Sequence, residues 1–381
     1  MPHIQTANEV HIVFYVAAFL VEFILLLQTF VKRRTDKSQN LAFIVMVSII
    51  MFNTITETIS ELAMPLIGES STAFLVTQIC NILYFMTHSL IAPVFFYYVQ
   101  CLTEVVKKRN NFEALLYVIT IALLEIFIIT NTFTGSIYYY DNMTFTRNWG
   151  EGIIYLVAVV YMALSIFSIF HYWNAITLSR RLSLMSFLGV VVVGLEVQAL
   201  YADIRCELFA EALGTLGVLL SLENEDEWID PDVGVYNRRG LEIDIDTLFK
   251  IGVNSDIISL RINDVSSSLK NIGMTNINNL SMDIANFLRT KIQWFYIYNI
   301  DPSQFIILVE NPERRNEKSL FDFFFKKYEP VLSTDELIDQ ILNRFSNNWN
   351  VGKNKMSLTP TILVSQISDG LKTVEDVFRL I

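Results

Sequence analysis

Long apolar runs fill the first 222 residues, and they restrict the possible folds more than any other feature of the chain. A segment that crosses a bilayer must satisfy its own backbone hydrogen bonds, so about 20 mainly apolar residues predict a transmembrane helix. Seven runs qualify, and their predicted bounds are Val10 to Val31, Leu41 to Met64, Thr72 to Cys101, Phe112 to Thr130, Gly152 to Trp173, Leu182 to Tyr201 and Ile204 to Leu222. The sequence therefore predicts a membrane-embedded, all-α seven-helix bundle.

The lysines and arginines of the short loops indicate how this bundle is oriented. Alternate loops carry nine bases, Lys32, Arg33, Arg34, Lys37, Lys107, Lys108, Arg109, Arg180 and Arg181. The other loops carry only Arg147 and Arg205. Basic loops stay in the cytoplasm, so the amino terminus is expected outside and everything after Leu222 inside.

Six glutamates are expected in the outer halves of the predicted helices. They are Glu57, Glu61, Glu125, Glu196, Glu207 and Glu211. A carboxylate within the bilayer is unfavourable unless it faces protein or water. One interpretation is an outward-facing acidic cavity that binds a cationic or hydrogen-bonding ligand, or that senses protons. The other is a set of interfacial residues held by Ser, Thr, Tyr or backbone partners at the helix ends.

Other patterns in the sequence exclude several classes of site and partner. The chain has three cysteines without a C-x-x-C pair and four histidines without metal-ligand spacing, so no metal site is expected. Acids outnumber bases by 24 to 17 after Leu222 and by 15 to 11 before it, which argues against a nucleic-acid partner. A transporter or channel stays an alternative, although no inverted repeat is visible.

After Leu222 the composition becomes that of a water-soluble α+β domain. We expect a sensor domain over 1–222, an acidic juxtamembrane linker over 223–233 and a separate domain over 234–381. The expected helices are Gly234 to Lys250, Asn271 to Lys291, Leu320 to Tyr328, Asp335 to Ser346 and one from Thr373; the expected strands are Ile257 to Ile262, Ile292 to Ile300, Phe305 to Glu310 and Leu358 to Val364. The turn between the two middle strands is Asp301 to Gln304.

The start of this second domain resembles a known motif. The chain reads Asp230-Pro231-Asp232-Val233-Gly234-Val235-Tyr236-Asn237-Arg238-Arg239. This is similar to D-x-L-T-G-L-x-N-R-R, with which diguanylate cyclase (GGDEF) domains open, except at Asp232 and Val233. The resemblance implies a nucleotide-cyclase palm fold, cyclic di-GMP-type signalling, and a multi-pass protein of the bacterial inner membrane.

The same resemblance implies that the catalytic machinery is missing. The metal carboxylate that ends the family's first strand would fall at Arg261, and Asp301, Pro302, Ser303 and Gln304 stand where Gly-Gly-Asp/Glu-Glu is usual. The family's two guanine contacts would fall at Leu269 and Asn278, of which only the Asn278 amide could still bind a base. The Arg-x-x-Asp motif of product inhibition is absent from Ile292 to Phe295.

The expected function is therefore a bacterial membrane receptor whose cytosolic GGDEF-like domain is catalytically degenerate and regulatory or partner-binding. Beyond the lipid bilayer, its expected partners are an unknown extracellular or intramembrane ligand and a second copy or another protein. No cofactor is expected. An active cyclase, with Mg²⁺ and GTP, is the alternative. The chain stops within a predicted helix at Ile381, so either that helix packs to its end or an output domain such as an EAL phosphodiesterase follows.

Overall fold

A computed structural model describes residues 2–31, 38–103, 111–141, 144–201, 204–223, 228–251, 255–263, 273–292, 296–310, 332–351, 354–367 and 373–380. The chain forms two compact units, Met1–Glu223 and Asn224–Ile381. We refer to them as the helical unit and the α+β unit.

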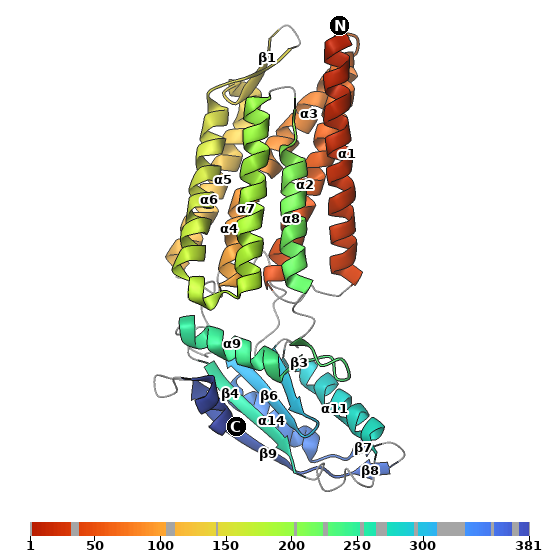
Figure 1. Cartoon of the computed structure of the whole chain (residues 1–381), viewed down its shortest axis with the longest axis vertical. Coiled ribbons are helices and arrows are strands. Elements are labelled where there is room, and N and C mark those ends of the chain that lie inside the picture. The colour runs from red at the N-terminus through yellow and green to blue at the C-terminus, as the bar shows by residue number, and fades with distance from the viewer. Residues whose placement is uncertain are drawn as a thin grey trace. The chain divides into compact units, whose positions relative to one another are not determined.

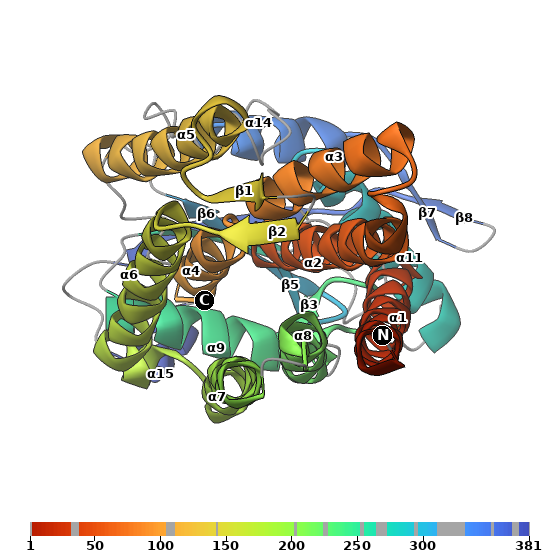
Figure 2. The ribbon, with the colours of Figure 1, turned by 90° about the horizontal axis from the view of Figure 1, so that it is seen from above.

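The helical unit is a bundle of long helices (Figure 1). Its helices are α1 (Pro2–Val31), α2 (Ser38–Ala63), the short turn η1 (Met64–Leu66), α3 (Ser71–His88), α4 (Ile91–Leu102), α5 (Asn111–Thr134), α6 (Gly150–His171), the short turn η3 (Trp173–Ala175), α7 (Leu178–Leu200) and α8 (Glu207–Glu223). Viewed along the bundle, α8 lies between α1 and α7, and α4 packs against α2 and α6 (Figure 2).

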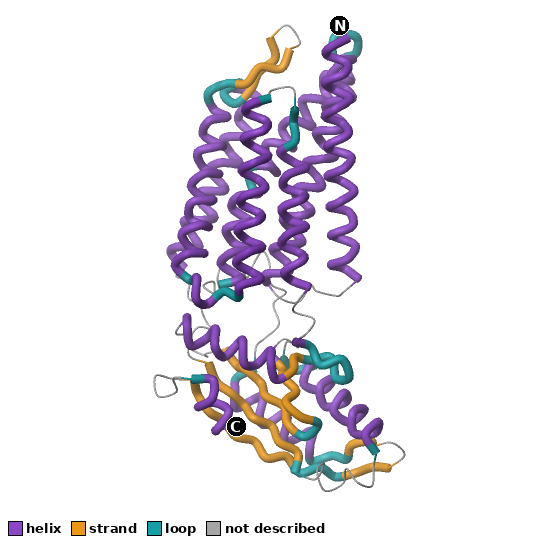
Figure 3. The backbone as a smooth tube through the Cα atoms, viewed as in Figure 1, coloured by secondary structure: helices purple, strands orange, loops and turns teal. Residues whose placement is uncertain are grey.

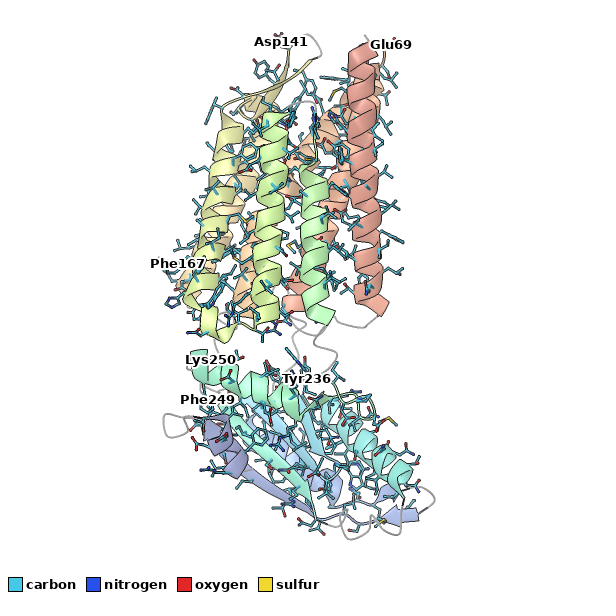
Figure 4. All side chains as sticks on the ribbon, in the orientation of Figure 1. Glu69, Asp141, Phe167, Tyr236, Phe249 and Lys250 are labelled. Atoms are coloured by element: carbon cyan, nitrogen blue, oxygen red, sulfur yellow. The ribbon has the colours of Figure 1, made fainter. Side chains whose placement is uncertain are left out.

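Six helical segments are long and apolar enough to cross a membrane. They are His11–Phe30, Gln39–Leu66, Ser71–Leu102, Phe112–Thr134, Gly150–His171 and Leu178–Gln198. Their outer surfaces carry large exposed apolar side chains, such as Phe23 on α1, Leu123 on α5 and Phe167 on α6, which projects away from the bundle (Figure 4). Such a surface suits lipid tails. The prediction of a multi-pass membrane protein is confirmed to this extent.

The seventh predicted span corresponds to α8, which differs from the other six. It has only 17 residues, which gives a length of about 26 Å against a hydrocarbon core of about 30 Å. Its first two turns carry Glu207 and Glu211, both buried against neighbouring helices. The short length and the two carboxylates separate α8 from the six candidate spans.

The third predicted span is broken in the structure. The apolar run predicts one helix over Thr72 to Cys101, but α3 ends at His88 and α4 begins at Ile91. Pro93 lies in the first turn of α4, where its missing N–H removes the bond that the carbonyl of Ser89 would accept in a continuous helix. The two segments together still form one candidate span, with a break directly after His88.

A small hairpin covers one end of the bundle, as Figure 3 shows in orange. Strands β1 (Tyr138–Asp141) and β2 (Thr144–Arg147) pair antiparallel, with Tyr138 opposite Arg147. Tyr138 packs on Phe85 of α3 with ring centroids 5.3 Å apart. The hairpin is therefore anchored to the bundle by aromatic contacts.

The α+β unit is built on a five-stranded sheet in the order β3-β5-β6-β4-β9. The strands are β3 (Tyr236–Asn237), β4 (Ser255–Ile262), β5 (Ile297–Asp301), β6 (Gln304–Glu310) and β9 (Pro360–Ile367). All neighbours are antiparallel except β3 and β5, which run parallel. A separate hairpin, β7 (Trp349–Val351) and β8 (Asn354–Met356), was not predicted because its strands have only three residues each.

Helices cover both faces of this sheet. On one face Leu241 and Ile245 of α9 (Arg238–Ile251) pack with Val377 of α15 (Val374–Leu380). On the other, α11 (Met274–Arg289) and α14 (Thr334–Phe345) form the larger core, where Ile284 and Ile341 are fully buried. The predicted α+β architecture is confirmed, and each predicted strand has a counterpart. The helix predicted over Leu320 to Tyr328 lies outside the described residues.

Candidate functional site

A polar pocket opens at the end of the helical unit that carries the β1–β2 hairpin. It encloses about 580 Å³ of space, counting the part open to solvent. Its lining residues come from α1, α2, α3, β2, α7, α8 and the segment before α8: Tyr15, Glu57, Ser60, Met64, Asn81, Tyr84, Phe85, Phe145, Arg147, Gln198, Arg205, Glu207 and Leu208. Segments far apart in the sequence therefore meet around one concave, charged surface, which is a frequent property of ligand sites.

Arg205 joins two of the predicted acids at this pocket. Its Nη1 lies 2.5 Å from Oε1 of Glu61 and 3.9 Å from Oε2 of Glu57. Nδ1 of His11 lies 3.7 Å from the same Glu61 oxygen. Burial opposes the charge of Arg205, but the carboxylates of Glu61 and Glu57 and the hydroxyl of Tyr15 hold its pKa above the usual value. Arg205 therefore stays protonated and compensates the charge of a buried carboxylate.

A second group of acids surrounds His88. Its Nε2 lies 3.4 Å from Oε1 of Glu207, and Glu211 lies one turn further along α8. Gln198 Nε2 donates to Oε2 of Glu207 at 3.1 Å, and the backbone N–H of Glu207 donates to Oε1 of Gln198 at 3.4 Å. The carboxylate of Glu207 is thereby fixed from α7, and it is both buried and part of the pocket wall.

The structure brings four of the six predicted glutamates to one region and leaves two apart. Glu57 and Glu207 line the pocket, Glu61 lies behind Glu57 on Arg205, and Glu211 is buried beside Glu207. Glu125 accepts a hydrogen bond from Oγ of Ser89 at the break between α3 and α4, at 2.8 Å. Glu196 is exposed on α7.

In the sequence, Arg147 and Arg205 serve only to indicate the topology, and they were not predicted to be site residues. Both line the pocket, and Arg147 also forms an ion pair with Glu151 at 2.8 Å. A usable signal was present, because these two are the only bases in the loops at that end of the predicted bundle. Gln198 and Tyr84 had no comparable signal in the sequence.

In the α+β unit, the matching residues of the opening motif have structural roles. Oδ1 of Asp230 accepts from the backbone N–H groups of Asp232 and Val233 at 2.9 and 3.1 Å. Gly234 has φ +74°, and its carbonyl accepts a bond from the guanidinium of Arg289. Asn237 Oδ1 accepts from the backbone N–H of Gly240 at 3.1 Å and caps α9. Each of these residues stabilises the turn that leads into the sheet.

The positions expected to have lost catalytic residues lie together. Arg261 on β4 is the cross-strand partner of Gln304 on β6. In the turn, Oδ1 of Asp301 accepts bonds from the N–H and the hydroxyl of Ser303 at 2.7 and 2.6 Å. The carbonyl of Pro302 accepts a bond from Ser281 of α11 at 3.0 Å. The Asp301 carboxylate and the Pro302 carbonyl therefore hold this turn through local hydrogen bonds.

The remaining predicted positions are only partly described. Asn278 donates to Oδ2 of Asp232 at 2.9 Å, so its amide is tied to the opening motif. Leu269 lies outside the described residues, as do three of the four residues at the position of the product-inhibition motif. The part of the expected linker that the structure describes, 228–233, packs on the α+β unit, where Val233 is buried.

No family model matches the chain, and no curated protein matches it. Two solved structures from Pseudomonas aeruginosa are similar. The GGDEF domain of FimX is 15% identical over 40% of this chain and 88% of its own, with a TM-score of 0.32. The diguanylate cyclase SiaD, in complex with its activator SiaC, is 16% identical over 60% of this chain and 79% of its own, with a TM-score of 0.35. Both likenesses are too distant to assign a function.

Proposed function

We propose that this protein is a bacterial membrane signalling receptor. Its helical unit binds a small ligand from outside, and its α+β unit is a cytosolic GGDEF-like domain that has lost catalysis and acts as a regulatory or partner-binding module. The helical unit spans the membrane seven times, with the amino terminus outside. A second copy of the chain or another protein is the expected partner of the α+β unit.

One relation carries this proposal: the pairing of Arg261 with Gln304 across β4 and β6. Aligning the chain with the GGDEF motif puts the metal carboxylate at Arg261 and the last acid of the signature at Gln304, positions that must be neighbours in any cyclase site. Their pairing supports the alignment, and with it the palm fold. Neither an arginine nor an amide can replace a carboxylate as a ligand for Mg²⁺.

The loops and α8 support this proposed topology. The nine bases in alternate loops favour a cytosolic α+β unit. A seventh span is needed to bring the chain to that side after α7, and α8 packs closely with α1 and α7. On this topology the pocket faces outward.

The pocket supports a small cationic or zwitterionic ligand. Glu57 and Glu207 offer carboxylates, and Arg147 and Arg205 lie in the same wall. A thermal-shift screen of amines and amino acids on the purified full chain tests this. The expected hit stabilises the native protein and loses its effect with Glu57→Gln. A compound that stabilises Glu57→Gln as much as the native protein would show that Glu57 is not part of the ligand site.

A turnover assay distinguishes a domain that has lost catalysis from an active cyclase. The full chain, purified in detergent, is incubated with GTP and Mg²⁺ or Mn²⁺, and cyclic di-GMP is measured by mass spectrometry. We expect none above a protein-free control. Product from the native chain that disappears with Arg261→Ala would overturn the degenerate reading and favour the active cyclase. Solute or ion flux in liposomes would instead favour a transporter.

A further inference from the structure

Three metal-ligating side chains converge inside the helical unit. They are His88 at the end of α3 and Glu207 and Glu211 in the first two turns of α8, and their ligand atoms all lie within 4.8 Å of one another. Glu207 and Glu211 face the same way because residues four apart share one face of a helix. The break after His88 ends α3 at this level of the bundle.

Two buried atoms in this cluster have no hydrogen-bond partner within the described part of the chain. They are Nδ1 of His88 and Oε2 of Glu211, whose residue is only 4% exposed. Buried polar atoms are rarely left unsatisfied, and such an atom often marks an ion or water that belongs to the site. The unpaired oxygen of Glu211 is thus a separate sign that something binds between these side chains.

The charge of the cluster also favours a bound cation. In the described ranges, neither Glu207 nor Glu211 forms an ion pair with a lysine or arginine. The two nearby arginines, Arg205 and Arg147, form their close ion pairs with Glu61 and Glu151. With a neutral imidazole and both acids ionised, the cluster would carry two negative charges, which one divalent cation cancels. A buried carboxylate without such compensation is strongly unfavourable.

We propose that His88, Glu207 and Glu211 bind a divalent first-row transition-metal ion, with Zn²⁺ as the best match. Ligands about 2.0–2.1 Å from a tetrahedral zinc lie roughly 3.4 Å from each other. The separation of His88 Nε2 and Glu207 Oε1 is 3.4 Å. The ligand atoms of the three residues lie within 4.8 Å of one another, so the third ligand needs to move inward by at most about 1.4 Å, which a carboxylate side chain does by rotation.

The chemistry of the ligands and their surroundings fits this class of metal. An imidazole nitrogen favours zinc and its neighbours over Mg²⁺ and Ca²⁺, which prefer oxygen ligands alone. Gln198 donates one hydrogen bond to the carboxylate of Glu207 and accepts another from its backbone N–H, so it fixes Glu207 as outer groups do around metal ligands. The ring of Tyr84 stacks on His88 with centroids 4.9 Å apart and holds the imidazole plane.

An ion can reach the cluster through the polar pocket. Glu207 is one of the three ligands, and it lines the pocket together with Gln198 and Tyr84, so an ion that enters the pocket meets the cluster at Glu207. This inference rests on the helical unit alone. It stands whether or not the α+β unit proves to be a regulatory domain.

The test measures metal binding by the full chain, purified in detergent and treated with chelator. Equilibrium dialysis against Zn²⁺, read by elemental mass spectrometry, gives stoichiometry and affinity. We expect about one tight Zn²⁺ per chain. Glu211→Gln and His88→Gln should each weaken it by at least about tenfold. Glu125→Gln, the same change on a partly buried acid outside the cluster, should leave the affinity unchanged.

A second measurement keeps the test decisive if a variant does not fold. Co²⁺ added to the native chain should give the intense visible bands of a four- or five-coordinate ion, and Zn²⁺ should abolish them. The weak spectrum of hydrated Co²⁺, no Zn²⁺ bound by the native chain, or equal binding by a folded His88→Gln variant would each overturn the proposal.

Discussion

Glu61 of α2 and Arg205, which precedes α8, form an ion pair at 2.5 Å although 144 positions separate them in the chain. The Glu61 side chain is 2% exposed, whereas that of Arg205 is 35% exposed and reaches the pocket. The pair therefore ties the start of α8 to α2 and also sets the charge of the pocket wall.

Replacing Arg205 by glutamine should destabilise the helical unit, because it removes the close arginine partner of the buried Glu61 and leaves the carboxylate with the imidazole of His11, 3.7 Å away. Breaking a buried pair from one side costs about 3–5 kcal/mol, and the partial exposure of Arg205 puts the expected loss near the lower end. The measurement is the thermal unfolding midpoint of the detergent-purified chain.

Two matched variants separate the pair from a general loss of positive charge. Arg147→Gln removes the ion pair with Glu151, four residues along the chain. Because the Arg147 side chain is 52% exposed, the free energy of unfolding should fall by less than about 1 kcal/mol. The double variant Glu61→Gln/Arg205→Gln should recover part of the stability lost in Arg205→Gln. A double variant less stable than either single one would contradict the role of the pair.

The β1–β2 hairpin should loosen when Tyr140 is replaced by phenylalanine. Asn81 of α3 donates to the Tyr140 hydroxyl at 2.8 Å and accepts from Ser60 at 3.0 Å, so the hydroxyl joins the hairpin to α2 and α3. Its loss should cost about 1 kcal/mol locally and speed hydrogen exchange in the hairpin. Tyr139→Phe, at the exposed neighbouring position, should change nothing. Unaltered exchange in Tyr140→Phe would show that aromatic packing alone holds the hairpin.

How much of the fold can be predicted from the sequence depends on how many neighbouring residues each sequence pattern covers. An apolar run covers about 20 consecutive residues, so the six candidate spans could be predicted within a few residues. The break after His88 depends on Pro93 and on the packing around it, and a hydropathy pattern does not register one proline. Trp349 to Met356 form a hairpin from strands too short to show an alternating pattern.

The candidate site was less predictable, because it depends on contacts between distant segments. The six glutamates could be identified from the sequence, because a carboxylate within an apolar run is easily recognised. Their partners were not: Arg205 appeared as a loop residue, and His88 showed no metal spacing within its own helix. Only the fold brings His88 next to Glu207, and local spacing carries no information about that contact. In the α+β unit Arg261 and Gln304 are cross-strand partners, whereas the roles assigned to the motif positions stay predictions.

Gly234→Ala should destabilise the α+β unit more than Gly273→Ala. Both glycines have positive φ, +74° and +80°, a backbone conformation that L side chains rarely adopt, so a Cβ strains the backbone at either position. At Gly234 the added Cβ would also lie 2.9 Å from the Arg289 guanidinium, which bonds the Gly234 carbonyl, whereas nothing lies within 4 Å at Gly273. Chemical unfolding of the full chain, followed by tryptophan fluorescence, measures the difference. Equal losses would mean that Arg289 adjusts without consequence.

Asp301→Ala should destabilise the β5–β6 turn without affecting any nucleotide reaction. The carboxylate of Asp301 accepts two bonds from Ser303, and their loss should cost about 1–2 kcal/mol. Ser303→Ala keeps the bond from the backbone N–H and removes only the one from the hydroxyl, so it should cost roughly half as much. Unfolding midpoints measure both, and cyclic di-GMP is assayed in parallel. If the turn had kept a catalytic role, these substitutions would lower a measurable production of cyclic di-GMP; we expect none in the native chain or in either variant. We expect Asp301→Ala to lose more stability than Ser303→Ala. If the native chain and both variants also make no cyclic di-GMP, the turn has a purely structural role.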